Sequence, residues 1–158
     1  MGVEELIIGK SNNGLGVFAN RNLEINELVN VFEGNLLKHE ELPHPYLLDR
    51  CVQIGKNLYL GLSIGIGDFI NHSCNPNCGI KIENNKVWLI AIKKILTGEE
   101  IGWDYSTTMD EDNWEMICNC GEENCRKRIR DFKYLPEEIQ KKYIKLDIVP
   151  DYIKEALN

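Results

Sequence analysis

Four cysteines are the residues whose types and spacing most clearly predict chemistry in this chain. One residue separates Cys118 from Cys120, Cys125 follows soon after, and Cys74 lies far upstream in the polar segment 71–77. Cysteines with one residue between them rarely form a disulfide, because the ring would be strained. Four thiolates instead match the tetrahedral ligand set of structural zinc. The sequence therefore predicts a Zn²⁺ site that fastens the C-terminal part of the chain to its middle.

The fourth zinc ligand stays open between two cysteines of one loop. Cys74 and Cys78 both lie there, and Cys74 is preferred because Cys78 begins the next predicted strand. Cys51 is expected in the hydrophobic core. A set of buried free thiols is the less favoured alternative to a metal site.

Composition predicts an ordinary globular domain. Hydrophobic residues make up 43% of the 158 residues and charged residues 27%, and no apolar run reaches the roughly 20 residues that span a bilayer. Residues 1–10 carry two glutamates and a short apolar patch, unlike a signal peptide. We therefore expect an intracellular protein, cytoplasmic or nuclear, with cysteines that are metal ligands or free thiols. The net charge of −7 disfavours nucleic acid as the main ligand. It fits a cationic ligand better, with solubility alone as the alternative role of the acidic residues.

Short apolar segments between turn signals predict a mainly β fold. The expected strands lie at 5–8, 15–19 and 27–32, as a pair within 51–60, and as a hairpin of 78–82 with 87–92. Residues 35–50 contain two prolines and are expected to be irregular. A helix should begin at Pro136, with Ile139, Tyr143 and Ile144 on one face, and a last short helix should follow Pro150.

Three further segments combine polar and aromatic residues in ways that suit a ligand site. Glycines in segment 14–16 precede an apolar strand and let the backbone approach a ligand closely. His72 lies beside a predicted metal ligand. Trp103 and Tyr105 alternate along an extended segment and so share one face. Each has an ordinary structural alternative: a hairpin turn, a hydrogen-bonding histidine and two core aromatics.

Taken in order, these motifs resemble a SET-domain protein lysine methyltransferase with a post-SET zinc segment. The resemblance is carried by Gly14-Leu15-Gly16, Asn71-His72-Ser73-Cys74 with Pro76-Asn77, Gly98-Glu99-Glu100 with Asp104-Tyr105, and Cys118, Cys120 and Cys125. It implies a SET-domain fold of several small β-sheets with a pseudoknot, plus short C-terminal helices. It also implies a SET domain over 1–107, a post-SET zinc segment over 108–130 and a helical extension over 131–158.

The resemblance assigns S-adenosylmethionine as methyl donor, Zn²⁺ as structural metal, and roles to single residues. The residues that would contact the donor are Gly14, Leu15, Gly16, Asn71, His72 and Tyr105. Tyr105 would also be the catalytic tyrosine, and Cys74, Cys118, Cys120 and Cys125 would hold zinc. Phe132 is the candidate aromatic that closes over the donor. Tyr46, preferred over Tyr59, is the candidate second tyrosine of the lysine channel.

The chain departs from the family at Trp103, where Phe or Tyr is usual in the lysine channel. An indole has no hydroxyl to hold a water beside the amine, which favours the addition of more than one methyl group. The acidic run 110–112 either lines a groove for a basic peptide or only solvates a loop. The expected partner is a lysine-containing protein or peptide, such as a histone or another basic chromatin protein, with no direct nucleic acid and no membrane. A non-catalytic peptide-binding or zinc-binding interaction module is the alternative.

Overall fold

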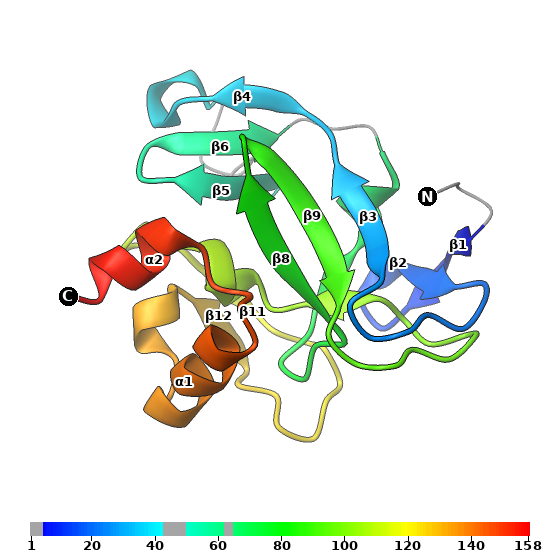
Figure 1. Cartoon of the computed structure of the whole chain (residues 1–158). Helices are drawn as coiled ribbons and strands as arrows, with labels where there is room; N and C mark the ends of the chain where they lie inside the picture. The colour runs from blue at the N-terminus through cyan, green and yellow to red at the C-terminus, as the bar shows by residue number, and fades with distance from the viewer. Residues whose placement is uncertain (1–4, 43–49, 62–64) are drawn as a thin grey trace.

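The computed structural model describes residues 5–42, 50–61 and 65–158, which form a mainly β protein of several small sheets (Figure 1). The strands are β1 (Leu6–Ser11), β2 (Gly14–Ala19), β3 (Leu28–Phe32), β4 (Asn35–Leu37), β5 (Cys51–Gly55), β6 (Leu58–Gly61), β7 (Asn71–His72), β8 (Cys78–Glu83), β9 (Lys86–Ala91), β10 (Gly102–Trp103), β11 (Glu115–Ile117) and β12 (Arg128–Arg130). The 3-10 helices are η2 (His39–Glu41), η4 (Ile66–Phe69), η5 (Tyr105–Thr108) and η6 (Phe132–Tyr134), and the α-helices are α1 (Glu137–Lys145) and α2 (Asp151–Ala156). The prediction of a mainly β fold with short C-terminal helices is confirmed.

Most strands pair with near neighbours in the chain. β1 and β2 form an antiparallel hairpin, as do β8 and β9, and β3 adds to β9 to complete a three-stranded sheet. β4, β6 and β5 form a second sheet in that order, and β11 pairs with β12. The β8–β9 turn uses Asn84 and Asn85 at φ values of 51° and 59°, a left-handed conformation that asparagine tolerates well. Among the helices of the described ranges, none has the length and apolar character needed to cross a membrane.

One ladder joins segments that are far apart in the sequence. β7 pairs with β10 in parallel, with His72 opposite Trp103. Asn77 strengthens the junction, because its side-chain amide donates to the carbonyl of Glu100 at 2.8 Å and its Oδ1 accepts the backbone N–H of Gly102 at 3.0 Å. Segments 71–77 and 100–105 are thereby held as one unit. The threaded pseudoknot implied by the family stays a prediction.

The main core fills the space between these small sheets. Its fully buried members include Val17, Leu23, Leu89, Ile95 and Ile101. Each such side chain contributes roughly 1.5–3 kcal/mol through burial, so the sheets are stabilised by a common interior rather than by their short ladders. Two smaller clusters lie around the cysteines and under the C-terminal helices. The division into a SET domain, a zinc segment and an extension stays a prediction.

The segment 35–50, predicted to be irregular, contains β4 and η2. β4 has three residues and pairs with β6, with Leu36 opposite Leu60. The backbones approach closely here, since a Cβ on Gly34 would lie 2.8 Å from the carbonyl oxygen of Gly61. A strand this short carries no periodic pattern, so its pairing partner rather than its own sequence determines it.

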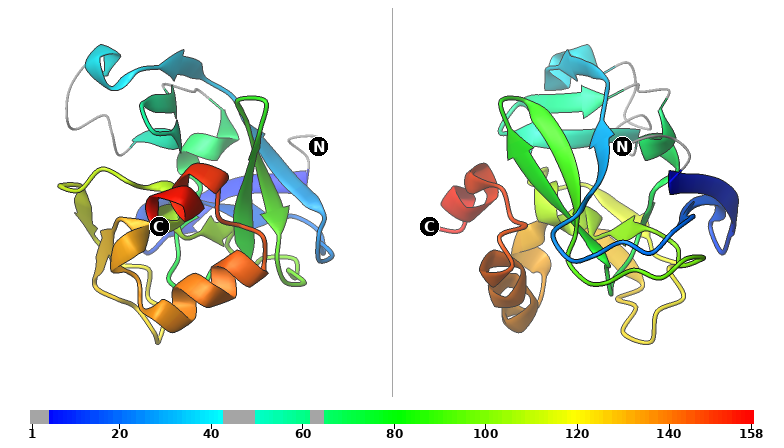
Figure 2. Two further views of the ribbon diagram at one scale, coloured as in Figure 1. Left: turned by 60° about the vertical axis from the view of Figure 1, so that its left-hand side comes forward. Right: turned by 45° about the vertical axis from the view of Figure 1, so that its right-hand side comes forward.

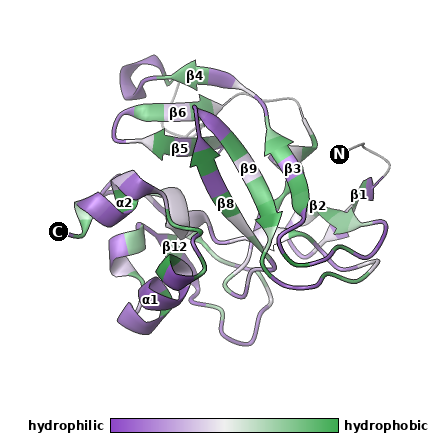
Figure 3. Cartoon of the chain, viewed as in Figure 1, coloured by the Kyte–Doolittle hydropathy of each residue, from purple (hydrophilic) through white to green (hydrophobic). Residues whose placement is uncertain are grey.

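The C-terminal helices pack together on one side of the β body (Figure 2). α1 is largely hydrophilic (Figure 3) and buries Tyr143, with Ile139 half-buried, whereas Ile144 is 39% exposed despite its predicted place on the same face. Ile148 lies between the helices and contacts β8, where a Cβ on Gly79 would lie 2.3 Å from its Cγ2 atom. The helices are therefore an integral part of the fold.

Gly79→Ala should destabilise the protein by about 1–3 kcal/mol, because the added methyl overlaps Ile148 and forces the C-terminal helices outward. Urea unfolding measures the change. Gly55→Ala is the matched control, since a Cβ there would meet only the Cβ of Leu58 at 3.4 Å, and it should change the free energy of unfolding by less than about 0.5 kcal/mol. Equal unfolding midpoints for Gly79→Ala and Gly55→Ala would contradict the packing of Ile148 against β8.

Candidate active site and metal centre

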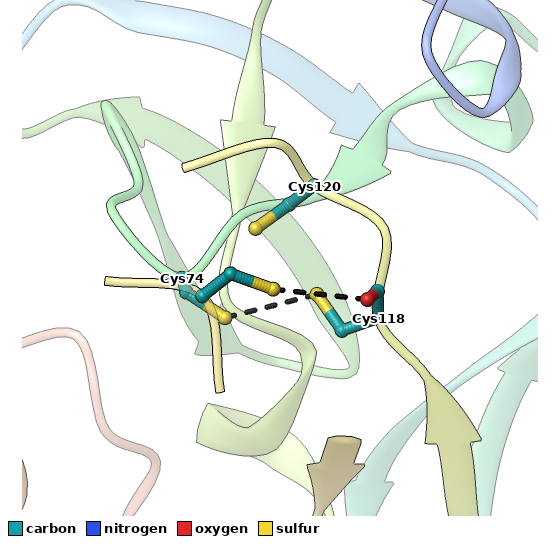
Figure 4. Close-up of side chains that lie close together, drawn as sticks. Cys74, Cys118 and Cys120 are labelled. Carbon is teal, nitrogen blue, oxygen red and sulfur yellow. Dashed lines mark hydrogen bonds between the residues drawn. The ribbon is translucent and has the colours of Figure 1, made fainter. Parts of the chain in front are cut away.

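The four cysteines predicted to bind zinc come together in the structure. The sulfur atoms of Cys74, Cys118, Cys120 and Cys125 all lie within 4.8 Å of one another. Figure 4 shows the sulfurs of Cys74, Cys118 and Cys120 directed toward a common point. Cys74 comes from the loop after β7, and the other three come from the segment between β11 and β12. The cluster therefore joins the C-terminal segment to the middle of the chain.

The geometry of this cluster fits a tetrahedral zinc ion. Zn–S bonds of about 2.3 Å place neighbouring sulfurs about 3.8 Å apart, and the sulfurs of Cys74 and Cys118 are 3.7 Å apart. Burial raises the pKa of the Cys74 thiol to about 11, so a thiolate there needs a cation beside it. The backbone N–H groups of Arg126 and Lys127 donate to the sulfurs of Cys74 and Cys125, both at 3.4 Å, and such outer contacts orient metal ligands.

The other two cysteines lie away from the cluster. Cys78 is fully buried in β8 among the residues of the main core, and burial raises the pKa of its thiol far above the usual range. Cys51 is a nearly buried residue of β5. The structure thus separates Cys74, which joins the sulfur cluster, from Cys78, the alternative fourth ligand.

A polar hollow lies where the β1–β2 hairpin meets β7. It is lined by Ser11, Asn13, Asn71, His72, Ser73, Asn75, Asn77, Glu100, Ile101, Gly102, Cys120 and Glu122. These residues come from the hairpin, the β7 loop, the β10 strand and the cysteine segment. The hollow is therefore bounded on one side by the candidate metal centre.

Asn71 and Glu100 fix the start of β2 beside this hollow. The amide of Asn71 donates to the carbonyl of Leu15 and to Oε1 of Glu100, both at 2.9 Å, and the Ser11 hydroxyl donates to the same carboxylate oxygen at 2.8 Å. A Cβ on Gly16 would lie 2.3 Å from that oxygen, which explains why the position is glycine. The start of β2 and Asn71, predicted to share a site, do lie together, although Gly14, Leu15 and Gly16 lie beside the polar hollow and do not line it.

Tyr105 follows β10 and begins η5. Its hydroxyl donates to the carbonyl oxygen of Ile70 at 2.6 Å. Its ring lies 4.8 Å from the Trp103 ring and 5.4 Å, edge to face, from the His72 ring, measured between centroids. Such aromatic pairs contribute about 0.5–1.5 kcal/mol beyond area burial. The orientation of Tyr105 is therefore fixed on several sides.

The His72 imidazole connects Tyr105 to the cysteine cluster. Its Nδ1 accepts the backbone N–H of Tyr105 at 3.1 Å, and its Nε2 lies 3.3 Å from the sulfur of Cys74. Burial lowers the pKa of His72 to about 4, although nearby Asp104 acts in the opposite direction. The ring is therefore neutral at pH 7, and acceptance at Nδ1 leaves the proton on Nε2, directed at the sulfur. His72 is a structural link rather than a free base.

A second, more apolar hollow is lined in part by Ile70, just before β7, and by Trp103 of β10. Its lining residues are Phe32, Glu33, Arg50, Cys51, Val52, Leu60, Gly61, Gly67, Asp68, Ile70, Trp103, Tyr105, Thr108, Met109 and Trp114. Ile70 and Tyr105 line this hollow, and the next two residues after Ile70 line the polar one. Trp103 is 5% exposed, and within the described ranges its indole N–H has no hydrogen-bond partner. Trp103 and Tyr105 thus both contribute to the lining of the apolar hollow.

Of the three other aromatic residues named as site candidates, the two that the structure describes line neither hollow. Tyr46 belongs to 43–49, which is outside the described residues. Tyr59, its alternative, is fully buried in β6. Phe132, the candidate aromatic over the donor, is 1% exposed and packs with Leu135 and Tyr143 under the C-terminal helices. Phe132 lines neither hollow, because η6 turns its ring into that cluster.

Two carboxylates at the site gained no role from sequence reasoning. Glu100 holds Asn71 and the start of β2, as described above. Asp104 is 1% exposed and accepts from the guanidinium of Arg126 at 2.8 Å and from the hydroxyl of Tyr143 at 2.9 Å. A charged residue between two aromatics, as in Trp103-Asp104-Tyr105, is the signal that indicates a buried, partnered acid at this position.

Comparison with known proteins decides the family. The family model for the SET domain matches residues 14–106. The chain belongs to the SET-domain family. The match begins at the first glycine of β2 and ends one residue after Tyr105, so the SET-domain assignment made from the motifs is confirmed. The cysteine cluster corresponds to the post-SET segment and lies mostly beyond the match.

Curated relatives are much longer proteins. Histone-lysine N-methyltransferase trr of Drosophila melanogaster is 29% identical over 131 residues, which covers 72% of this chain and 5% of the relative. Human histone-lysine N-methyltransferase 2D is 29% identical over 133 residues, covering 72% of this chain and 2% of the relative. The SET-domain chain therefore spans only a small part of the relatives that it matches.

Solved structures share the fold. KRYPTONITE in complex with mCHG DNA and SAH superposes with a TM-score of 0.67 at 22% identity, covering 79% of this chain and 29% of that one. A candidate histone methyltransferase of Plasmodium falciparum gives a TM-score of 0.54 at 33% identity, covering 63% of this chain and 91% of that one. These likenesses confirm the predicted SET-domain architecture.

The purified protein should contain about one zinc ion per chain, and Cys74→Ala should lose it because three thiolates hold zinc less tightly than four. Elemental mass spectrometry measures the ratio of zinc to protein. Cys78→Ala is the control, and it should keep the metal while losing some stability through its core cavity. Retention of zinc by Cys74→Ala together with its loss from Cys78→Ala would reverse the ligand assignment.

Proposed function

We propose that this chain is a protein-lysine N-methyltransferase that uses S-adenosylmethionine. The observation that carries the proposal is the place of Tyr105, which lines the apolar hollow and whose hydroxyl is held by the carbonyl of Ile70, the residue just before Asn71 of the polar hollow. A methyl transfer needs two such compartments, one for a charged donor and one for an alkylamine. The SET-domain match supports the same activity.

The polar hollow is the proposed donor site. The first residues of β2 (Gly14, Leu15 and Gly16) would bind the donor together with Asn71 and His72. When bound, S-adenosylmethionine supplies an electrophilic methyl group on a sulfonium. A hydrogen bond from Asn71 already fixes the backbone of Leu15, so the start of β2 beside the hollow is organised in advance. The structure of KRYPTONITE, which shares the fold and contains SAH, supports this class of ligand.

The apolar hollow is the proposed lysine channel. A free lysine amine has a pKa of about 10.4, so only a small fraction is neutral at pH 7. The walls formed by Phe32, Leu60 and Trp103 would disfavour the ammonium form. The Tyr105 hydroxyl would orient the neutral amine, and the amine proton would leave to water. No side chain acts as a dedicated general base in this proposal.

The proposed substrate is a lysine-bearing segment of a basic protein, such as a histone or another chromatin protein. Glu33 lines the apolar hollow, as do Asp68 and the Arg50 that pairs with it at 3.5 Å. The net charge of −7 attracts basic partners. The names of the curated relatives support a histone substrate and a nuclear or chromosomal location, with the cytoplasm as the alternative. Trp103 favours the addition of more than one methyl group.

Tyr105→Phe should keep donor binding but lose about a hundredfold in turnover, because the amine is no longer oriented. Calorimetry measures donor affinity, and transfer of labelled methyl groups to a histone mixture measures turnover. Tyr134→Phe is the control, since Tyr134 is 46% exposed and lines neither hollow. Unchanged turnover in Tyr105→Phe would remove the catalytic tyrosine from the proposal.

Gly16→Ala should weaken donor binding about tenfold or more, because the new methyl displaces the Glu100 carboxylate and with it the Asn71 amide. The same calorimetric titration measures this loss. Gly55→Ala, at a position that lines neither hollow, should bind the donor as the wild-type protein does. Equal donor affinity for the wild-type protein, Gly16→Ala and Gly55→Ala would contradict the placement of the donor at β2.

A further inference from the structure

The C-terminal helices lie outside the SET-domain match of 14–106, yet one of their side chains reaches the residue next to Tyr105. Tyr143 of α1 is 2% exposed, and its hydroxyl donates to Oδ2 of Asp104 at 2.9 Å. Burial beside this carboxylate raises the pKa of the Tyr143 hydroxyl far above the usual range, so it stays protonated and remains a donor.

Asp104 is held from three sides. Tyr143 satisfies Oδ2, while Oδ1 accepts from the Arg126 guanidinium at 2.8 Å and from the backbone N–H of Ser106 at 3.1 Å. These partners belong to α1, to the cysteine segment and to η5. A buried carboxylate that loses one of its donors keeps the cost of desolvation without the compensating bond, so it moves toward its remaining partners.

Movement of Asp104 would be transmitted directly to Tyr105. Asp104 is the N-cap of η5, the 3-10 turn whose first residue is Tyr105. The backbone of Tyr105 also donates to His72 at 3.1 Å, and its hydroxyl to Ile70 at 2.6 Å. These two bonds fix the ring only while the N-cap keeps its place.

We propose that Tyr143 is a positioning residue, through which the C-terminal extension orients the Tyr105 hydroxyl in the lysine channel. The proposal rests on the methyltransferase function proposed above. It differs from a general stabilising role, because a second tyrosine of the extension offers a comparison. The single hydroxyl proton of Tyr152, in α2, is shared between the backbone carbonyls of Gln53 and Thr108. Thr108 is the last residue of η5, so Tyr152 bonds the end of this turn opposite to the Asp104 N-cap.

The test compares Tyr143→Phe with Tyr152→Phe in the full chain. Tyr143→Phe should lower kcat about tenfold, the effect of about 1.4 kcal/mol in the transition state, while KM for the donor stays within about twofold. Tyr152→Phe should lower the unfolding temperature but leave kcat within about twofold. Thermal unfolding of each variant reports stability separately, so a loss of kcat is not confused with a loss of folded protein.

A second measurement does not depend on turnover. In protein labelled with ¹³C in its tyrosine rings, the Tyr105 signal should shift in Tyr143→Phe and stay in place in Tyr152→Phe. An unshifted Tyr105 signal, or equal loss of kcat in the two variants, would overturn the positioning role. Absence of methyl transfer by the wild-type protein would overturn the proposed function instead, and the ring signal would still decide the placement of Tyr105.

Discussion

The parallel pairing of β7 with β10 is the constraint on which the rest of the site depends. This two-residue ladder brings Asn71 and His72 beside the strand that leads into Tyr105. A ladder so short contributes little by itself, so the side chains around it must hold it. His72 holds the ladder because its imidazole accepts a hydrogen bond from the backbone N–H of Tyr105 and contacts the sulfur of Cys74. One histidine therefore connects the candidate metal centre to the candidate catalytic residue.

Buried polar groups then couple the peripheral segments to this centre. Asp104 is nearly inaccessible to solvent and receives donors from the cysteine segment through Arg126 and from α1 through Tyr143. Because an unpaired buried carboxylate is costly, these segments can dock only where they satisfy it. The cysteine segment and the helical extension therefore do more than close the fold, since both determine where η5 begins.

The sequence alone was sufficient for the residues whose chemistry is visible in their spacing. The cysteine set, the glycines of β2 and the aromatic pair around Asp104 could be predicted, because thiol spacing and alternation along a strand are local patterns. The contact of Glu100 with the start of β2 could not be predicted, because it depends on how close the folded chain brings the Glu100 carboxylate to Gly16. Phe132 was assigned by its position after the cysteines, but η6 directs it into the helical cluster, and only tertiary packing determines that direction.

The two hollows, lined by the consecutive residues Ile70 and Asn71, are proposed to bind the donor and the lysine of a methyl transfer. The most direct measurement incubates the wild-type protein with methyl-labelled S-adenosylmethionine, a whole-cell lysate and purified histones, and identifies modified residues by mass spectrometry. The account predicts labelled methyl groups on the ε-amines of lysines. Binding of the donor with no labelled lysine in either protein mixture would contradict it and would indicate a non-catalytic SET-fold binding module.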